Sequence, residues 1–184
     1  GKLGVRVAHV EAGLRSFDST MPEEFNRIET DKISDFLFTT EKSGNINLEK
    51  EGISKDKIFF VGNVMIDTLL EHKEKASKSK ILEKLGLEGN NYCALTLHRP
   101  SNVDDRKDFE NILHILERIQ EKLKIVFPMH PRARKNIQSF KLENKIKSMK
   151  NLIITEPLGY LDFLCLMSNS KFVLTDSGGI QEEA

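Results

Sequence analysis

Residues 173–184, VLTDSGGIQEEA, carry the pattern of a strand, a tight glycine turn and the start of a helix. The apolar run ends at Thr175-Asp176, the turn is Ser-Gly-Gly, and a helical pattern restarts at Ile180. Backbone N–H groups at a helix N-terminus attract anions, and glycine lets a phosphate approach the backbone closely. An ordinary connection between a strand and a helix has the same pattern. The stretch therefore predicts a strand-turn-helix unit and, as a hypothesis, an anion site at its turn.

Strand and helix patterns alternate along the whole chain. We expect strands in the short apolar and β-branched runs at residues 5–10, 35–39, 57–61, 92–97, 125–129, 152–154 and 171–174. We expect helices in the segments between them, beginning at Pro22 and spanning residues 42–51, 63–70, 104–123, 133–147 and 160–167. Alternation at these lengths is typical of parallel sheets covered by helices, so the predicted fold class is α/β.

Two of these helices have recognisable apolar positions. In residues 104–123 the apolar side chains recur every three or four residues, at Phe109, Ile112, Leu113, Leu116, Ile119 and Leu123. In the helix that begins at Pro22 the apolar positions are Phe25, Ile28 and Ile33. The first set forms one stripe, which we expect to lie on a sheet.

The composition of the sequence changes after Gly62. Residues 71–84, EHKEKASKSKILEK, are mostly charged and small side chains with little to bury, as is typical of a junction between domains. We therefore expect the later part of a first domain in residues 1–64, a junction in residues 65–80 and most of a second domain in residues 81–184.

The composition excludes several classes of protein. Lys plus Arg and Asp plus Glu both number 28, so the zero net charge gives no reason to expect nucleic acid or an anionic membrane as a partner. No apolar run approaches a membrane span and residues 1–10 lack the layout of a signal peptide, which favours a cytoplasmic location. The chain begins without Met, so a preceding segment is expected. Cys93 and Cys165 lie in apolar runs and are predicted to be buried free thiols.

Polar residues directly follow four of the predicted strands. In open parallel sheets ligands bind beyond the carboxyl ends of the strands, so these residues are the first candidates for a site. The four pairs are His9 and Glu11, His98 and Arg99, His130 and Arg132, and Asp176 and Ser177. Loops after strands are commonly polar, and His9 also fits a partly buried histidine with a hydrogen-bond partner. Three of the five histidines nevertheless occupy these positions, which favours a functional site.

Glu11 and Glu23 are candidates for proton transfer. A carboxylate between two apolar residues, as at Glu11, must find polar partners or have a raised pKa, and proton-transfer sites use such carboxylates. An ion pair with Arg15 is the alternative for Glu11. Glu23 stands in the helix start PEEFNR, four residues before Arg27, which is the spacing of an ordinary surface pair. Alternatively, Glu23 projects from the helix N-terminus into the same cleft as Glu11.

His98 and Arg99 follow the strand predicted at residues 92–97. His98 is a candidate general acid or base or a phosphate contact, and Arg99 either pairs with phosphate or caps a neighbouring element. Pro100 is expected to keep the next helix from starting before a cap signal at residues 101–104. The spacing of these residues matches neither a zinc site nor a Ser-His-Asp triad, and the second half of the chain has no GxGxxG fingerprint.

Longer motifs connect these residues to a known family. They read HVEAGLRSFDSTMPEEFNRIETDKISDFLFTT (residues 9–40), VGNVMIDTLL (61–70), LTLHRPSNVDD (95–105), PMHPR (128–132) and TDSGGIQEEA (175–184). In this order and at these distances they resemble the non-hydrolysing UDP-N-acetylglucosamine 2-epimerases, and the resemblance extends over essentially the whole chain. It implies two Rossmann-like domains that face each other across a cleft, the arrangement called GT-B, both present here only in part.

The resemblance also implies a reaction. Members of the family interconvert UDP-N-acetylglucosamine and UDP-N-acetylmannosamine without a metal, a nicotinamide or another cofactor. They remove the C2 proton and eliminate UDP to give 2-acetamidoglucal, then return UDP and deliver a proton to the opposite face of C2. The implied partners are these two nucleotide sugars, UDP-N-acetylglucosamine as an allosteric ligand, and a second subunit in a homodimer. The implied role is polysaccharide biosynthesis.

Position-by-position matching to the family motifs implies roles for individual residues. Glu11, Glu23 and His98 match the catalytic residues of the family. Ser177 and Gly178 match its contacts to the diphosphate, and Glu183 matches its contact to the nucleotide ribose. Arg99 and His130 match residues near the bound nucleotide or the allosteric ligand.

The family pattern has parts that this chain lacks. They are a Gly-Thr-Arg-Pro-Glu loop, a catalytic aspartate upstream of HVEAG and a continuation past QEEA, so the chain matches the middle of such an enzyme and is expected to be inactive alone. Three alternatives remain open: a GT-B glycosyltransferase, a hydrolysing epimerase that releases free N-acetylmannosamine, and a non-catalytic protein that binds sugar nucleotides. The two glutamates of PEEFNR argue against the glycosyltransferase, and HVEAGLRS differs from the motif of the hydrolysing epimerases.

Overall fold

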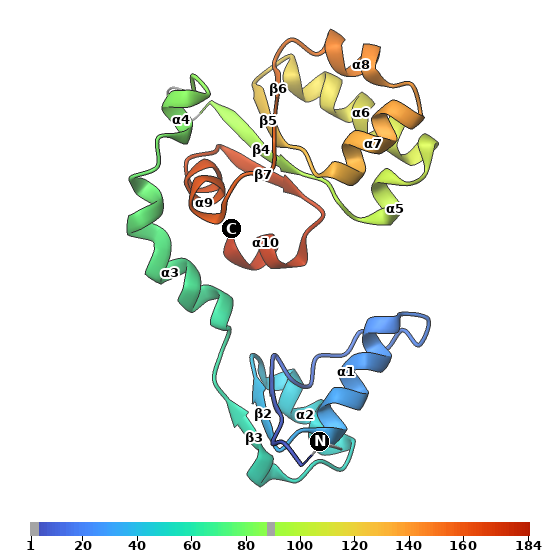
Figure 1. Cartoon of the computed structure of the whole chain (residues 1–184), viewed down its shortest axis with the longest axis vertical. Helices are drawn as coiled ribbons and strands as arrows, with labels where there is room; N and C mark the ends of the chain where they lie inside the picture. Colours follow the sequence, from blue (N-terminus) through green and yellow to red (C-terminus); the bar gives the residue numbers. More distant parts are fainter. Residues whose placement is uncertain (1–3, 88–90) are drawn as a thin grey trace. The chain divides into compact units, whose positions relative to one another are not determined.

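The computed structural model describes residues 4–87 and 91–184. The chain divides into two compact units, Gly1–Asp67 and Thr68–Ala184 (Figure 1). The division falls inside residues 65–80, which are helical over most of their length as α3 (Val64–Ser77). Contrary to expectation, residues 71–84 do bury side chains: Ala76 (2% exposed) and Ile81 (6%) pack against helix α9 (Tyr160–Ser168).

The first unit is built on a parallel sheet. Within its described residues, 4–67, three strands pair in the order β1-β2-β3. The elements in chain order are β1 (Ala8–Val10), α1 (Pro22–Ile33), β2 (Phe36–Thr39), α2 (Lys42–Lys50), a 3-10 helix (Lys55–Lys57) and β3 (Ile58–Phe60). Ala12, Leu37 and Leu48 are fully buried at the centre of this unit. The predicted alternation of strands and helices is confirmed here.

Helix α1 begins at Pro22 as expected, but its apolar positions do not form its buried face. Phe25 and Ile33 are 66% and 53% exposed. The buried residues of α1 are instead Glu24 and Asp31. Their carboxylates accept hydrogen bonds from backbone N–H groups of the loop that follows β1, and apolar side chains could not satisfy those groups.

The second unit contains a larger parallel sheet. Within its described residues, 68–87 and 91–184, four strands pair in the order β6-β5-β4-β7. They are β4 (Tyr92–Thr96), β5 (Lys124–Pro128), β6 (Leu152–Thr155) and β7 (Phe172–Thr175). The chain runs outward from β4 to β6 and then returns to place β7 on the other side of β4. This reversal of strand order between β4 and β7 is a topological switch point, where ligands of such sheets usually bind.

Helices cover both faces of this sheet (Figure 1). The remaining helices are α4 (Ile81–Lys84), α5 (Pro100–Val103), α6 (Arg106–Gln120), α7 (Pro131–Ser139), α8 (Glu143–Ser148) and α10 (Gly178–Glu183). The apolar stripe predicted for α6 is confirmed, because Phe109, Leu113 and Leu116 are buried against one face of the sheet with α7 and α8. Helix α9 packs Leu166 against the opposite face.

Two helix boundaries differ from the sequence prediction. Residues 133–147 do not form one helix, because α7 ends at Ser139 and Lys141 takes a left-handed conformation (φ 59°). The N–H groups of Lys141 and Leu142 donate to the carbonyls of Gln138 and Ile137, which is the hydrogen-bond pattern of a Schellman motif. This motif usually has glycine at the left-handed position, where this sequence has lysine. Pro100 does not delay a helix either, since it is the first residue of α5, where its missing N–H costs nothing.

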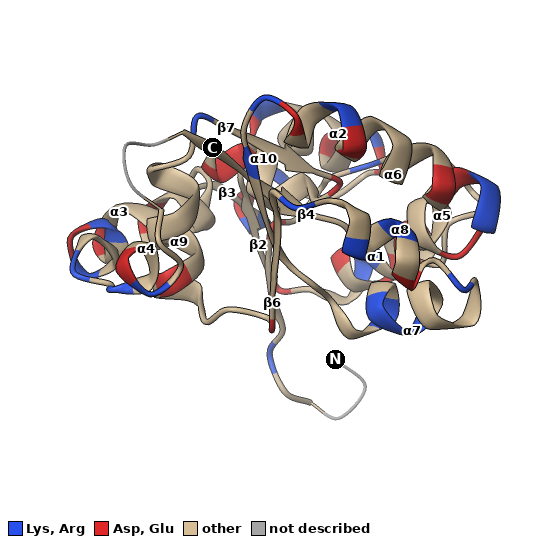
Figure 2. Cartoon of the chain, turned by 90° about the horizontal axis from the view of Figure 1, so that it is seen from above, with Lys and Arg blue, Asp and Glu red and all other residues tan. Residues whose placement is uncertain are grey.

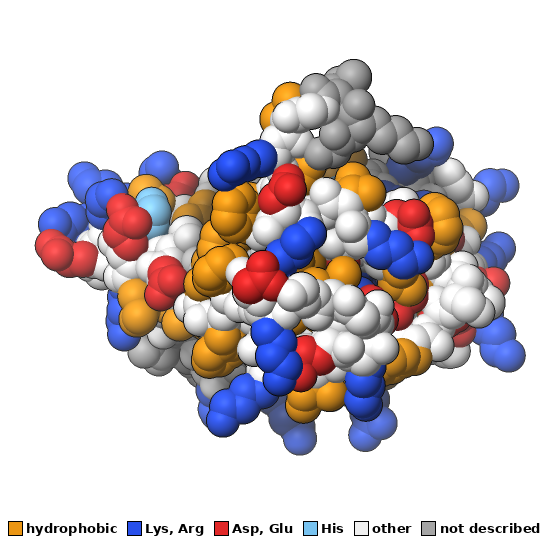
Figure 3. Space-filling view, turned by 90° about the horizontal axis from the view of Figure 1, so that it is seen from below, with side chains coloured by type: hydrophobic (Ala, Val, Ile, Leu, Met, Phe, Trp, Pro, Cys, Tyr) orange, Lys and Arg blue, Asp and Glu red, His pale blue; other side chains and the backbone are white. Residues whose placement is uncertain are grey.

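The surface agrees with the balanced composition. Basic and acidic residues are interspersed in the second half of α3 (Figure 2), and on the face in Figure 3 apolar side chains lie between charges of both signs. Among the described residues, none of the helices has the length and apolarity needed to cross a membrane. The prediction for the cysteines is confirmed: Cys93 and Cys165 are free and buried, and burial raises the pKa of the Cys93 thiol to about 11.

Candidate functional site

The carboxyl ends of β4 and β7 form the centre of the candidate site in the second unit. Thr96 and Thr175 lie opposite each other in the parallel register, and their hydroxyl oxygens are 2.7 Å apart. Each strand then ends, and the chain continues into His98 on one side and Asp176 on the other. Two segments that are far apart in sequence thus place their polar ends at one sheet edge.

Asp176 organises this edge. Its carboxylate is 9% exposed and accepts hydrogen bonds from the backbone N–H of His98 (2.9 Å) and of Arg99 (2.8 Å). It also accepts from the Asn102 side-chain amide at 3.1 Å and pairs with the His98 Nδ1 at 2.8 Å. Burial alone raises the pKa of Asp176, but the hydrogen bonds from Arg99 and His98 outweigh it and lower the pKa.

The Asp176 contact orients the His98 ring. The carboxylate engages Nδ1 and orients the ring, while the side chain remains 47% exposed. The other ring nitrogen, Nε2, can therefore exchange a proton with a bound molecule. From the sequence, Asp176 was predicted to follow a strand, but no role could be assigned to it. Its contact with His98 depends on the pairing of β4 with β7.

A cavity of about 230 Å³ opens beside His98. Its polar lining comes from Thr96, His98, His130 and Ser177, and its apolar lining includes Leu158, Phe163 and Ile180. The His98 and His130 rings lie 6.4 Å apart, and His130 also caps α7 by accepting the Arg132 N–H at Nδ1. A polar edge and an apolar wall are the usual features of a pocket for an organic ligand.

The turn before α10 adjoins this cavity. The Ser177 Oγ accepts the N–H of Ile180 at 3.4 Å, and the Ser177 N–H donates to the Thr175 hydroxyl at 3.0 Å. A side-chain carbon added at Gly178 would lie 4.0 Å from a guanidinium nitrogen of Arg99. A cation therefore lies beside a turn whose glycine leaves the backbone accessible, which suits an anionic group.

Glu183 lies apart from the cavity beside His98. It is at the C-terminal end of α10 and borders a second cavity, of about 420 Å³, together with Lys73 and Met167. The Tyr160 hydroxyl donates to the Glu183 carboxylate at 3.4 Å. Burial, followed by the nearby Glu183 charge, raises the pKa of Tyr160.

Glu11 directly follows β1 in the first unit. It is exposed and has a left-handed backbone (φ 73°), and the N–H groups of Glu11 and Ala12 both donate to the Phe38 carbonyl at 3.0 Å. The proposed ion pair with Arg15 is not formed, because Arg15 pairs with Asp31 and Glu51. The Glu11 carboxylate is thus left exposed to solvent in this unit.

Glu23 is exposed in the first turn of α1. The surface pair expected with Arg27 is not formed, since Arg27 lies 3.9 Å from the carboxylate of Glu24 instead. Glu24 is buried and accepts hydrogen bonds from Ser16 and Phe17. The two adjacent glutamates therefore have different surroundings, and the sequence did not distinguish the structural one from the exposed one.

Six of the eight candidate residues lie in the second unit, and five of them gather at the sheet edge and the turn before α10, apart from Glu183. These five are His98, Arg99, His130, Ser177 and Gly178. Glu11 and Glu23 belong to the first unit. Within residues 4–87 and 91–184, no group of three or more His, Cys, Asp or Glu side chains is arranged to hold a metal ion.

Comparison with known proteins identifies relatives over the whole chain. Residues 1–184 match the family model described as UDP-N-acetylglucosamine 2-epimerase. The UDP-N-acetylglucosamine 2-epimerase of Methanocaldococcus jannaschii is 47% identical over 188 residues, which cover 100% of this chain and 51% of that protein. The UDP-2,3-diacetamido-2,3-dideoxy-D-glucuronate 2-epimerase of Pseudomonas aeruginosa is 40% identical over 187 residues, covering 100% and 50%. The chain spans about half the length of these curated relatives.

Solved structures agree with this result. The Methanocaldococcus jannaschii UDP-GlcNAc 2-epimerase in complex with UDP-GlcNAc and UDP has a TM-score of 0.88 at 46% identity, covering 100% of this chain and 51% of that one. The Neisseria meningitidis UDP-GlcNAc 2-epimerase bound to UDP-GlcNAc has a TM-score of 0.85 at 34% identity, covering 100% and 51%. The class is therefore an α/β protein with Rossmann-like units of the GT-B type and a candidate site at a sheet switch point. More particularly, the chain belongs to the UDP-N-acetylglucosamine 2-epimerase family.

Proposed function

We propose that the protein to which this chain belongs interconverts UDP-N-acetylglucosamine and UDP-N-acetylmannosamine. The observation that carries the proposal is the sheet edge where Asp176 orients His98, beside Arg99 and the Ser177-Gly178 turn. Such an edge holds an acid/base group next to a place for an anion. Membership in the epimerase family supports the same substrate class.

The proposed reaction begins with removal of the C2 proton of the sugar. The electron pair left at C2 forms the C1–C2 double bond of 2-acetamidoglucal as the C1–O bond to UDP breaks. UDP then returns to C1 and a proton is delivered to the opposite face of C2. We assign the acid/base work to Glu11, Glu23 and His98, because two faces of one carbon need two arrangements of acid/base groups.

The remaining assignments concern substrate binding. We propose that Ser177, Gly178 and Arg99 contact the diphosphate and that Glu183 contacts the ribose. His130, which lines the cavity with His98, is assigned to the nucleotide or to an allosteric UDP-N-acetylglucosamine. We also propose that the two units are parts of the first and second Rossmann-like domains. The protein is proposed to be a cytoplasmic homodimer, a location that its free buried cysteines favour.

Exchange of the C2 hydrogen tests the proposed reaction. We expect the full-length protein, incubated with UDP-N-acetylglucosamine in D₂O, to incorporate deuterium at C2 as UDP-N-acetylmannosamine forms, because the proton lost to a side chain mixes with solvent. The measurement is proton NMR with mass spectrometry of the products. The Glu11→Gln variant should bind UDP but show neither epimerisation nor exchange.

Several outcomes would contradict the proposal. Epimerisation with retention of the C2 hydrogen would rule out proton transfer at this carbon. Release of free N-acetylmannosamine and UDP would indicate a hydrolysing epimerase, and transfer to an added acceptor sugar without C2 exchange would indicate a glycosyltransferase. Binding of UDP-N-acetylglucosamine without any turnover would indicate a non-catalytic binding protein.

A further inference from the structure

Two buried carboxylates on α1 hold the loop that follows β1. Asp31 and Glu24 are only 1% and 5% exposed, although acidic side chains are usually exposed to solvent. They stand seven residues apart, about two helical turns, and therefore lie on the same face of α1. That face contacts residues 9–17, which include Glu11.

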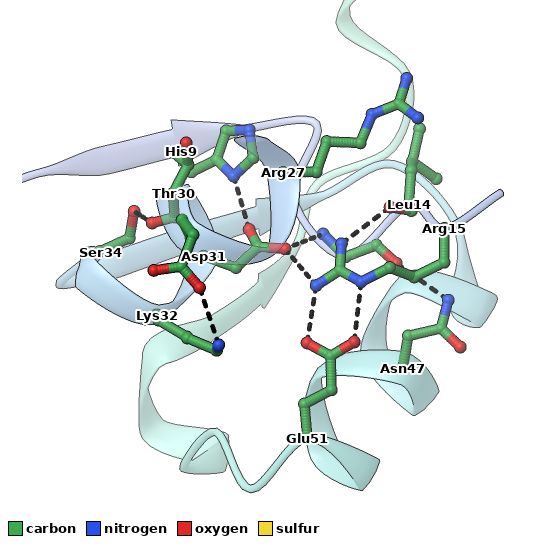
Figure 4. Close-up of polar contacts among 12 residues, drawn as sticks. His9, Leu14, Arg15, Arg27, Thr30, Asp31, Lys32, Ser34, Asn47 and Glu51 are labelled. Atoms are coloured by element: carbon green, nitrogen blue, oxygen red, sulfur yellow. Dashed lines mark hydrogen bonds and ion pairs between the residues drawn. The ribbon is translucent and has the colours of Figure 1, made fainter. Parts of the chain in front are cut away.

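Asp31 binds the first part of this loop (Figure 4). One carboxylate oxygen lies 2.5 Å from the His9 Nδ1. The other accepts the backbone N–H of Gly13 at 3.1 Å and the Arg15 guanidinium at 2.7 Å. The Asp31 carboxylate therefore contacts residues on both sides of Glu11.

Glu24 binds the second part of the loop. One of its oxygens accepts both the backbone N–H and the hydroxyl of Ser16, each at 2.9 Å, and the other accepts the N–H of Phe17 at 3.0 Å. The hydrogen bond from the Ser16 backbone, the largest cause, lowers the pKa of Glu24. The two carboxylates thus hold residues 13–17 along the length of α1.

Helix α2 and its C-cap residue, Glu51, hold the loop from another side. The Arg15 guanidinium donates to both oxygens of Glu51 at 2.7 Å, and the Asn47 amide donates to the Gly13 carbonyl at 2.9 Å. A side-chain carbon at Gly13 would lie 2.4 Å from the Gly44 carbonyl oxygen, so the backbones are in close contact. Arg15, whose side chain is 1% exposed, connects the two helices through the loop.

The conformation of Glu11 makes this support necessary. A left-handed backbone at a residue other than glycine costs roughly 1–2 kcal/mol and persists only where the surroundings hold it. Asp31 fixes residues on both sides of that position. The same helix carries Glu23 in its first turn, next to Glu24.

We propose that Asp31 and Glu24 are positioning residues that fix the backbone of Glu11 relative to Glu23 through helix α1. The inference rests on the proposed function, in which these two glutamates move protons. Helix α1 acts as the common support, since it carries Glu23 directly and holds the Glu11 loop through two buried carboxylates. Acid/base groups lose much of their effect when displaced by about 1 Å, so such a support controls turnover.

The test replaces Asp31 by Asn in the full-length protein. The amide keeps the size of the side chain but has one acceptor oxygen and no negative charge, so its N–H₂ group faces either the His9 Nδ1 or the donors at Gly13 and Arg15. We expect kcat to fall by about 30-fold to 100-fold with KM for UDP-N-acetylglucosamine changed less than about threefold. The measurement is made at a temperature where circular dichroism shows the variant fully folded. Glu29→Gln is the matched control, because Glu29 is an exposed carboxylate on the same helix that pairs only with Lys32 among the described residues.

A purely structural role predicts a different result. In that case Asp31→Asn lowers the melting temperature but leaves kcat of the folded protein unchanged, and this outcome would overturn the inference. Glu24→Gln provides the second variant if Asp31→Asn does not fold, with the same expected change in kcat.

Amide hydrogen exchange separates this inference from the proposed function. If the wild-type protein has no epimerase activity, the proposed function fails, and the positioning role is decided by exchange at Glu11 and Ala12. We expect these two amides, which donate to the Phe38 carbonyl, to exchange at least about tenfold faster in Asp31→Asn than in wild type or Glu29→Gln. Unchanged exchange would show that Asp31 does not hold the loop.

Discussion

At the scale of single residues, Asp176 connects the fold to the candidate chemistry. Its buried carboxylate accepts two backbone N–H groups and an amide, and it pairs with the His98 ring. Each contact removes a polar group from water and satisfies it with another. The same carboxylate therefore stabilises the sheet edge and sets the orientation of the proposed acid/base histidine.

The lowered pKa of Asp176 predicts how stability depends on pH. A carboxyl whose folded pKa lies below its unfolded value of about 3.9 stabilises the protein above that pH, and the contribution is lost as pH falls through the folded pKa. We expect Asp176→Asn to be less stable than wild type at pH 7, with the difference shrinking below about pH 4. Tyrosine fluorescence during urea unfolding reports this unit, because Tyr92 and Tyr160 both lie in it. A difference that stays constant from neutral to acidic pH would contradict the assignment. Glu71→Gln, at an exposed carboxyl of the same unit, serves as the control.

Glu23 and Glu24 show the limit of sequence interpretation for single residues. Both are first-turn acids of α1, and nothing local separates them. The loop at Ser16 and Phe17 approaches only one side of the helix, so one carboxylate becomes a buried acceptor and the other stays exposed. Candidate site residues could be proposed from motifs, but their surroundings depend on the packing of that loop.

At the scale of elements, the strands and the larger helices were predictable from local pattern. The stripe of α6 follows from its period of three to four residues, and its Asp105 caps the helix by accepting the Asp108 N–H at 3.0 Å. The break between α7 and α8 was not predictable, because the left-handed residue that ends α7 is Lys141 and not the glycine that usually marks such an ending. Helix α1 was placed correctly but its buried face was not, since that face satisfies polar backbone rather than apolar surface.

Tyr92 joins two elements of the second unit and allows a test at this scale. Its side chain is 1% exposed, and its hydroxyl on β4 donates to the Leu166 carbonyl of α9 at 2.7 Å. We expect Tyr92→Phe to lower the free energy of unfolding by about 1–2 kcal/mol, because a buried hydrogen bond is lost without repacking. Urea unfolding followed by circular dichroism measures the change. Tyr160→Phe, at a hydroxyl on the surface, should change stability by less than about 0.5 kcal/mol, and equal effects of the two would refute the argument.

At the scale of the whole molecule, the core is divided between the two units. Among the described residues, three clusters of buried side chains lie wholly within Thr68–Ala184 and one lies within Gly1–Asp67. A unit that contains its own core can fold without its neighbour. The link between the units is α3, which begins in one and ends in the other.

Residues 68–184 are therefore expected to fold alone. Expressed separately, this segment should show a cooperative urea transition, and its tyrosine fluorescence should give a midpoint close to that of the whole chain, because its three buried clusters are retained. A broad transition, or loss of helical circular dichroism in buffer, would show that the first unit is needed for folding.

The sequence by itself determined the α/β class, the order of elements and the strand ends at which His98, His130 and Ser177 stand. These features depend on local periodicity and turn chemistry, which neighbouring residues specify. Only the tertiary structure decided that β7 pairs with β4, that Asp176 therefore holds His98 across 78 positions of sequence, and that Asp31 and Glu24 hold the loop around Glu11. The physical reason is that buried carboxylates take their partners from whichever backbone groups packing brings near, and no local pattern encodes those partners.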